Sequence, residues 1–136
     1  MKIIILLIFL YTNIVFATTL DKILPHYLEM QTALANDSLA KAQVAASDIS
    51  KLKNIEENNL LQSNDKIKNA KNISIAREEF KIFSKPFVDW VQKNKKVGLI
   101  VVSCSMADAK WVQKDGEVAN PYFGSEMKTC GDKLPK

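Results

Sequence analysis

Four sulfur-bearing side chains near the C-terminal end of the sequence are the residues best suited to chemistry. Cys104 is followed two positions later by Met106, and Cys130 is preceded three positions earlier by Met127. Thiolate and thioether groups are soft ligands that select Cu(I) over harder cations. These four residues are therefore the first candidates for a metal site.

The same two cysteines also admit a structural interpretation. Together they would close a loop of about 27 residues, and a disulfide there would contribute roughly 3 to 4 kcal/mol to stability. Met106 and Met127 would then fill gaps in the packing under Trp111. From the residues alone, a metal site and a disulfide-stapled loop both stay open.

His26 and Met30 form a second candidate pair of metal ligands. They are four positions apart, so a helix would place both side chains on one face. A single histidine beside Pro25, at the start of a helix, is more often a surface or capping residue. We therefore rank this pair behind the four sulfur residues.

No catalytic motif accompanies these residues. The sequence has no Cys-x-x-Cys pair, no Gly-rich phosphate loop and no Gly-x-Ser-x-Gly turn. The roughly 25 residues between Cys104 and Cys130 argue against the compact geometry of thiol redox motifs. We expect no enzymatic activity.

Residues 1–17 have the pattern of an export signal. Lys2 precedes the apolar run 3–10, and Val15-Phe16-Ala17 fits a cleavage site. The run is shorter than the ~20 apolar residues that a membrane-spanning helix needs. We expect cleavage after Ala17, a periplasmic or secreted location and no stable membrane span in the mature chain; an uncleaved N-terminal anchor is the alternative.

The remaining residues, 18–136, suffice for one domain with a single core. The whole sequence carries a formal net charge of +4 at pH 7, with lysines and acidic residues interspersed along it. Nucleic-acid-binding proteins instead gather basic residues on one surface. The composition therefore predicts a solvated surface and no nucleic-acid partner.

Helices are predicted to position the sulfur residues. Apolar side chains recur at three- and four-residue steps between polar breaks. The first two predicted helices cover residues 21–35 and 38–57. Polar breaks are predicted at 58–59 and 63–65, and a shorter third helix then ends near residue 71. The fourth predicted helix covers residues 74–95. Asp37 is the expected N-cap of the second helix, and the segment Asn72-Ile-Ser74 is expected to cap the fourth. The alternative is that the third and fourth helices are one interrupted element. Pro86 predicts a bend near Ser84.

The C-terminal segment 98–131, which carries the sulfur motif, shows no helical period. Residues 98–104 are apolar and β-branched and indicate either a short extended segment or a buried lead-in to the motif. Residues 107–123 are expected to be irregular, with a helical turn near 125–129. The predicted fold is all-α: an up-and-down bundle of about four helices with an irregular C-terminal Cys/Met segment.

Several motifs in this segment resemble those of a known family. They are Cys104-Ser-Met106-Ala, Trp111-Val-Gln113, Asn120-Pro-Tyr-Phe-Gly124, Met127 and Cys130-Gly131. The segment 27–37 and the Ala76-Arg77 pair, followed by Phe80 and Ser84, extend the match into the helices. Together they resemble an uncharacterised helical domain found at the C-terminus of periplasmic adaptor subunits of copper and silver efflux pumps, and also as stand-alone exported proteins. Ser105 stands where that family commonly has proline.

The resemblance implies copper or heavy-metal handling outside the cytoplasm. We therefore expect an exported protein that binds Cu(I) through the sulfur residues and is linked to metal efflux or resistance. Its partner would be a periplasmic efflux adaptor or another envelope protein. The alternative is a disulfide-stapled helical interaction module that binds no metal.

Overall fold

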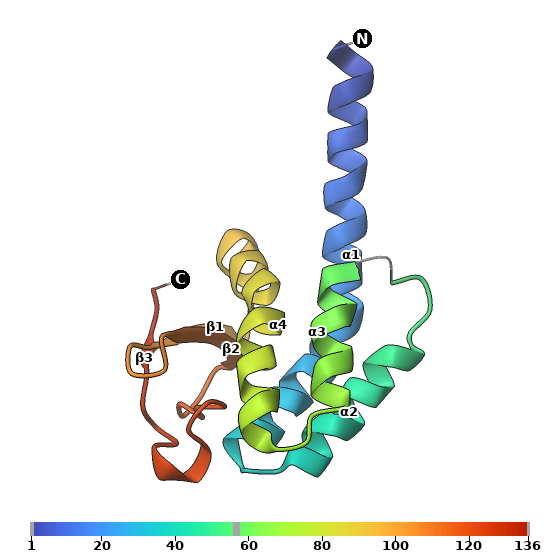
Figure 1. Cartoon of the computed structure of the whole chain (residues 1–136). Coiled ribbons are helices and arrows are strands. Elements are labelled where there is room, and N and C mark those ends of the chain that lie inside the picture. The colour runs from blue at the N-terminus through green and yellow to red at the C-terminus, as the bar shows by residue number, and fades with distance from the viewer. Residues whose placement is uncertain (1, 56–57, 136) are drawn as a thin grey trace.

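The computed structural model describes residues 2–55 and 58–135, which form four α-helices followed by a small sheet (Figure 1). The helices are α1 (Lys2–Ala35), α2 (Leu39–Lys51), α3 (Asn58–Lys68) and α4 (Ile73–Asn94). The strands are β1 (Leu99–Cys104), β2 (Ala109–Lys114) and β3 (Asp132–Lys133), and a 3-10 helix, η1, covers Gly124–Glu126. Consecutive helices pack against one another, and α4 also packs on β1 and β2.

The helical core forms because apolar positions recur with the period of a helix. On α1, Leu20, Ile23, Tyr27, Met30 and Leu34 have no exposed surface. Their steps of three and four residues place them along one face, which is the arrangement that buries a helix against its neighbours.

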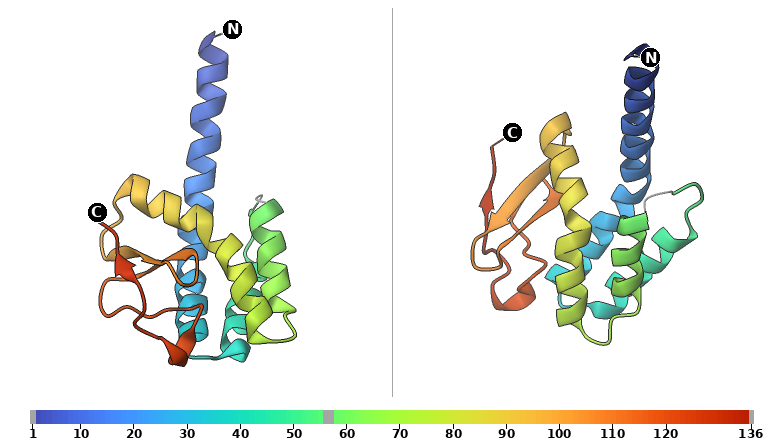
Figure 2. Two further views of the ribbon diagram at one scale, coloured as in Figure 1. Left: turned by 60° about the vertical axis from the view of Figure 1, so that its left-hand side comes forward. Right: turned by 45° about the horizontal axis from the view of Figure 1, so that its top comes forward.

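The apolar steps of three and four residues predicted for the fourth helix form a buried aromatic stripe on α4. Phe80, Phe83 and Phe87 are at most 1% exposed. Pro86 lies inside the helix, and Figure 2 shows α4 changing direction along its length. A proline removes one backbone donor and crowds the preceding turn, so the bend agrees with the prediction from the sequence.

Tyr27 joins the helices to the sheet. Its ring stacks on that of Phe87, with ring centroids 4.3 Å apart. Its hydroxyl is hydrogen-bonded to the Ser84 hydroxyl and accepts the backbone N–H of Val112 at 2.9 Å. Burial raises the pKa of Tyr27 far above its ordinary value, so the phenol stays protonated. One side chain thus connects α1, α4 and β2.

The prediction of an all-α fold is wrong. The C-terminal segment forms a three-stranded antiparallel sheet in the order β2-β1-β3. Residues 109–114, expected to be irregular, pair with β1 so that Trp111 lies opposite Val102. This pairing provides hydrogen-bond partners for the backbone N–H and C=O groups of the buried strand β1. An irregular neighbouring segment would leave these groups without partners.

Two predicted helix boundaries also need correction. The second helix was expected to reach residue 57 but α2 ends at Lys51, because Leu52 adopts an extended conformation; residues 56–57 lie outside the described residues. The break predicted at 63–65 falls inside α3. Asn64 is buried there and donates its side-chain N–H to the carbonyl of Ala46 at 2.9 Å, so a polar residue serves helix packing instead of ending the helix.

The segment predicted to be an export signal, residues 1–17, falls within the N-terminal half of α1, apart from Met1, which lies outside the described residues. That half of α1 projects away from the other elements (Figure 1). Within the described part of the chain, no helix combines the length and the apolar character required to cross a membrane. Cleavage after Ala17 stays a prediction.

Candidate functional site

Cys104 is held at the end of β1 by a tight turn. It pairs with Ala109 as the last pair of the β1–β2 ladder, and residues 105–108 connect the two strands. The N–H of Asp108 donates to the carbonyl of Ser105 at 3.1 Å, which closes this turn. Cys104 is 2% exposed, so its backbone and side chain are both fixed by the sheet.

Cys130 reaches β1 through the third strand. Its N–H donates to the carbonyl of Met127 at 3.1 Å, and β3 begins two residues later, with Asp132 opposite Ser103. Gly131 makes this approach possible, because a Cβ there would lie 2.7 Å from a methyl group of Val102. The pairing of β1 with β3 therefore places Cys130 beside the end of β1, where Cys104 lies.

The two cysteines consequently lie side by side as free thiols. Their Sγ atoms are 3.3 Å apart, within hydrogen-bonding distance. Cys104 is buried and Cys130 is partly exposed. The hydrogen bond to Cys104 and desolvation raise the pKa of the Cys130 thiol. The expectation that distance along the sequence would prevent a compact thiol pair is wrong.

The predicted methionine ligands are placed differently. Met106 lies on the turn 105–108 and is 67% exposed; it lines a surface hollow with Phe123, whereas Cys104 lines a separate hollow. Met127 is partly buried at the first position of the turn that ends at Cys130. The structure therefore brings together the two thiols of the four predicted ligands, and Met127 lies at the start of the turn that ends at Cys130.

The second predicted pair does not form a site. Met30 is fully buried in the helical core, while the Nδ1 atom of His26 lies 3.2 Å from the Glu29 carboxylate. Among the described residues, no group of three or more His, Cys, Asp and Glu side chains is arranged to hold a metal ion. The thiol pair is thus the arrangement on which a metal site can be built.

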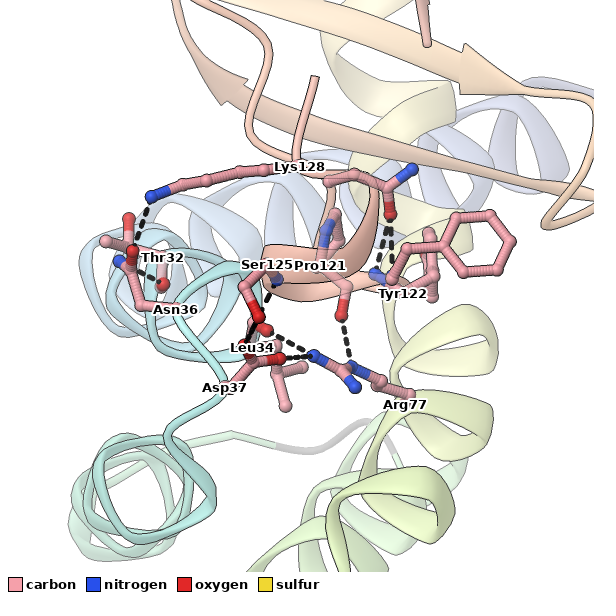
Figure 3. Close-up of polar contacts among 11 residues, drawn as sticks. Thr32, Leu34, Asn36, Asp37, Arg77, Pro121, Tyr122, Ser125 and Lys128 are labelled. Atoms are coloured by element: carbon pink, nitrogen blue, oxygen red, sulfur yellow. Dashed lines mark hydrogen bonds and ion pairs between the residues drawn. The ribbon is translucent and has the colours of Figure 1, made fainter. Parts of the chain in front are cut away.

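A network of polar contacts fixes the segment that leads to Cys130 (Figure 3). The Asp37 carboxylate accepts a bond from Arg77 Nη2 at 2.7 Å and from both the backbone N–H and the hydroxyl of Ser125. Arg77 Nε donates to the carbonyl of Pro121 at 2.8 Å. Side chains of the α1–α2 connection and of α4 therefore tie the segment 119–130, here called the strap, to the helices.

The network was not predicted from the sequence. Asp37 was expected to be the N-cap of the second helix, but Ser38 occupies that position and accepts the N–H of Lys41. Asp37 instead has φ of 56° and directs its carboxylate toward the strap. One signal was available: Arg77 is the only arginine among the 19 basic residues. Arginine offers a rigid fork of donors that lysine lacks.

Gly124 is required where the strap meets this ion pair. It has φ of 57°, and a Cβ at this position would lie 1.9 Å from an oxygen of Asp37 and 2.3 Å from Arg77 Nη2. Any side chain would therefore displace the ion pair, in addition to the strain of a left-handed backbone. Glycine is what lets the strap approach the helices closely.

The Asp37 contacts predict an acid-sensitive contribution to stability. The hydrogen bonds from Ser125 and Arg77 lower the pKa of Asp37 from 3.8 to about 2. A carboxyl group whose pKa is lower in the folded than in the unfolded state stabilises the fold at pH values above its unfolded-state pKa. For Asp37, this contribution is lost as the pH falls from about 4 to about 2.

Thermal unfolding from pH 6 to pH 2 would measure this contribution. Asp37→Asn should lower the melting temperature at pH 6, and the gap to the wild type should narrow below pH 4. Asp89→Asn, at an exposed carboxyl of α4, is the matched control. A gap that stays constant down to pH 2 would contradict the assignment.

Comparisons with known proteins place these features in context. A family profile described as "Protein of unknown function (DUF3347)" matches residues 23–97. The matched range begins within α1 at residue 23, covers all of α2, α3 and α4, and ends before β1. Neither a curated protein nor a solved structure gives a significant match.

Proposed function

Because the chain belongs to the DUF3347 family of unknown function, we propose its function from the thiol pair: it binds a soft metal ion, Cu(I), through Cys104 and Cys130. The observation that carries this proposal is the 3.3 Å separation of the two Sγ atoms in their reduced form. Thiolates favour Cu(I) among the biological metals, and two of them suffice for a small ion of low coordination number.

The geometry of the pair is close to what a bridging metal needs. Metal–thiolate bonds of about 2.3 Å place two sulfurs about 3.8 Å apart at a tetrahedral angle and about 4.6 Å apart around a linear two-coordinate ion. The observed separation therefore requires an opening of roughly 0.5 to 1.3 Å, which the partly exposed Cys130 side chain can provide. Both thiols must lose their protons on binding. Met127, at the first position of the turn that ends at Cys130, would add a third, thioether sulfur in this proposal.

The cellular role is proposed from the sequence. The signal-like residues 1–17 and the resemblance to the domain of copper and silver efflux adaptors support an exported protein that buffers Cu(I) or passes it to an efflux adaptor or another envelope protein. In this role the thiols must remain reduced or reducible. Met106, exposed on its turn, is available for the exchange of the ion with such a partner.

The second candidate function rests on the same thiols. In an oxidising compartment they would form a disulfide, and the chain would then be a stapled interaction module. A thiol oxidoreductase is favoured less, because nucleophilic cysteines have lowered pKa values, whereas the pKa of Cys130 is raised.

An anaerobic competition titration of the reduced chain with Cu(I) and a chelator tests the metal-binding proposal. We expect one-to-one binding that weakens by at least about tenfold, or 1.4 kcal/mol, in Cys104→Ser and in Cys130→Ser. Met127→Leu should weaken binding less than either, and Ser105→Ala, in the turn next to Cys104, is the control. If both cysteine variants compete with the chelator as well as the wild type does, the proposal fails.

A further inference from the structure

Asn120 is hydrogen-bonded through both its side chain and its backbone at the start of the strap. The residue is fully buried. Its side-chain N–H donates to the carbonyl of Cys130 at 2.8 Å, while its side-chain oxygen accepts the N–H groups of Tyr122 at 2.8 Å and Phe123 at 3.1 Å. Its backbone N–H donates to Lys128 O at 2.7 Å.

These contacts close the strap on itself. The accepting bonds fix the turn 120–123, and the donating bonds connect that turn to residues 128 and 130, which lie at the far end of the strap. The bond to Cys130 is made to its backbone and leaves the thiol free. A buried side-chain amide whose N–H donor and oxygen acceptor both make hydrogen bonds rigidifies the segment around it.

We propose that Asn120 is a positioning residue that sets the separation of the Cys104 and Cys130 thiols. Cys104 is fixed by the sheet, so the spacing of the pair depends on where the backbone of Cys130 is held. The Cys130 backbone is fixed on its C-terminal side by the pairing of Asp132 in β3 with β1. Its carbonyl group is fixed by the hydrogen bond from Asn120. Removing the Asn120 donor frees the Cys130 carbonyl and lets the thiol pair separate.

Asn120→Asp tests this role, because it keeps an acceptor for Tyr122 and Phe123 but removes the donor to Cys130. The inference concerns the same thiols as the proposed function, yet its test needs no metal. The full-length chain is equilibrated in glutathione redox buffers at fixed pH, and the Cys104–Cys130 disulfide is quantified by mass spectrometry. The equilibrium constant gives the effective concentration of one thiol at the other.

The matched control is Asn64→Asp in α3. Asn64 is also fully buried and also donates its amide to a backbone carbonyl, that of Ala46, but lies in the helical part of the molecule. We expect Asn120→Asp to lower the effective thiol concentration at least tenfold and Asn64→Asp to change it less than twofold. Should Asn120→Asp not fold, Asn120→Ser carries the same comparison, because its hydroxyl can cap the turn but is too short to reach Cys130.

Equal effects of the two aspartate variants, or no effect of Asn120→Asp, would overturn the inference. So would a wild-type chain that forms no disulfide in oxidised glutathione. A chain that passes this test but does not bind Cu(I) would refute the proposed function alone.

Discussion

Oxidation of Cys104 and Cys130 to a disulfide is expected to raise the free energy of unfolding by about 3.5 kcal/mol. The bond would close a loop of about 27 residues and so restrict the unfolded chain. Because the Sγ atoms already lie 3.3 Å apart, little rearrangement of the strap is needed to form it. The effect is large compared with the 5–15 kcal/mol stability of a typical domain.

Urea unfolding of the oxidised and the reduced chain measures this difference. The Cys104→Ser/Cys130→Ser double variant is the control and should respond to neither oxidant nor reductant. An oxidised chain that is no more stable than the reduced one would mean that the disulfide strains the strap. The same experiment identifies the conditions under which the two thiols are reduced. Metal binding must be tested under these conditions, because sulfurs joined in a disulfide cannot act as thiolate ligands.

Trp111→Ala is expected to lower the free energy of unfolding by about 3–5 kcal/mol. Trp111 is the largest fully buried side chain and packs edge-on against Tyr122, with ring centroids 5.8 Å apart. Gly131 lies against its ring, and its indole N–H donates to the side-chain oxygen of Gln113 at 3.0 Å. The variant would leave a cavity between the sheet and the strap.

Urea unfolding followed by far-UV circular dichroism checks this value. Trp111→Phe keeps most of the apolar volume and loses the bond to Gln113, so it should cost less than Trp111→Ala. Exposed Val97, at 99% exposure, supplies a control in Val97→Ala, which should change stability by less than about 0.5 kcal/mol. A loss below about 1 kcal/mol for Trp111→Ala would show that the ring is not part of the core.

Local signals in the sequence predicted much of the helical part. The stripe of phenylalanines on α4 and the cap at Asn72, which accepts the N–H of Ile75, follow from spacing and residue type alone. Residues 99–104 were recognised as apolar and without helical period, and they form β1. Each of these features is determined by residues close together in the chain.

The features that were missed depend on contacts between distant segments. β2 carries lysines at both ends of its Trp-Val-Gln centre, and β3 has only two residues, both exposed, so neither strand shows a clear alternating pattern. The proximity of Cys104 and Cys130 results from the pairing of β1 with β3, and no local signal encodes it. The fixing of the strap by Asp37 and Arg77 spans about 40 residues of sequence and is equally non-local.

These non-local contacts also determine how the sulfur residues are arranged. The helices supply a rigid base, the polar network holds the strap on it, and the sheet brings the strap's cysteine to the one at the end of β1. In this arrangement the predicted metal ligands are not equivalent: the thiols lie together, Met127 belongs to the adjoining turn and Met106 is exposed to solvent.

The most direct test of metal binding by this thiol pair is the X-ray absorption spectrum of the reduced chain loaded with one equivalent of Cu(I). Binding at this site predicts a first shell of two or three sulfurs, at the distance of about 2.3 Å typical of metal–thiolate bonds, which is lost in the Cys104→Ser/Cys130→Ser variant. A first shell of nitrogen or oxygen, or a sulfur shell that the double variant retains, would show that the metal binds elsewhere.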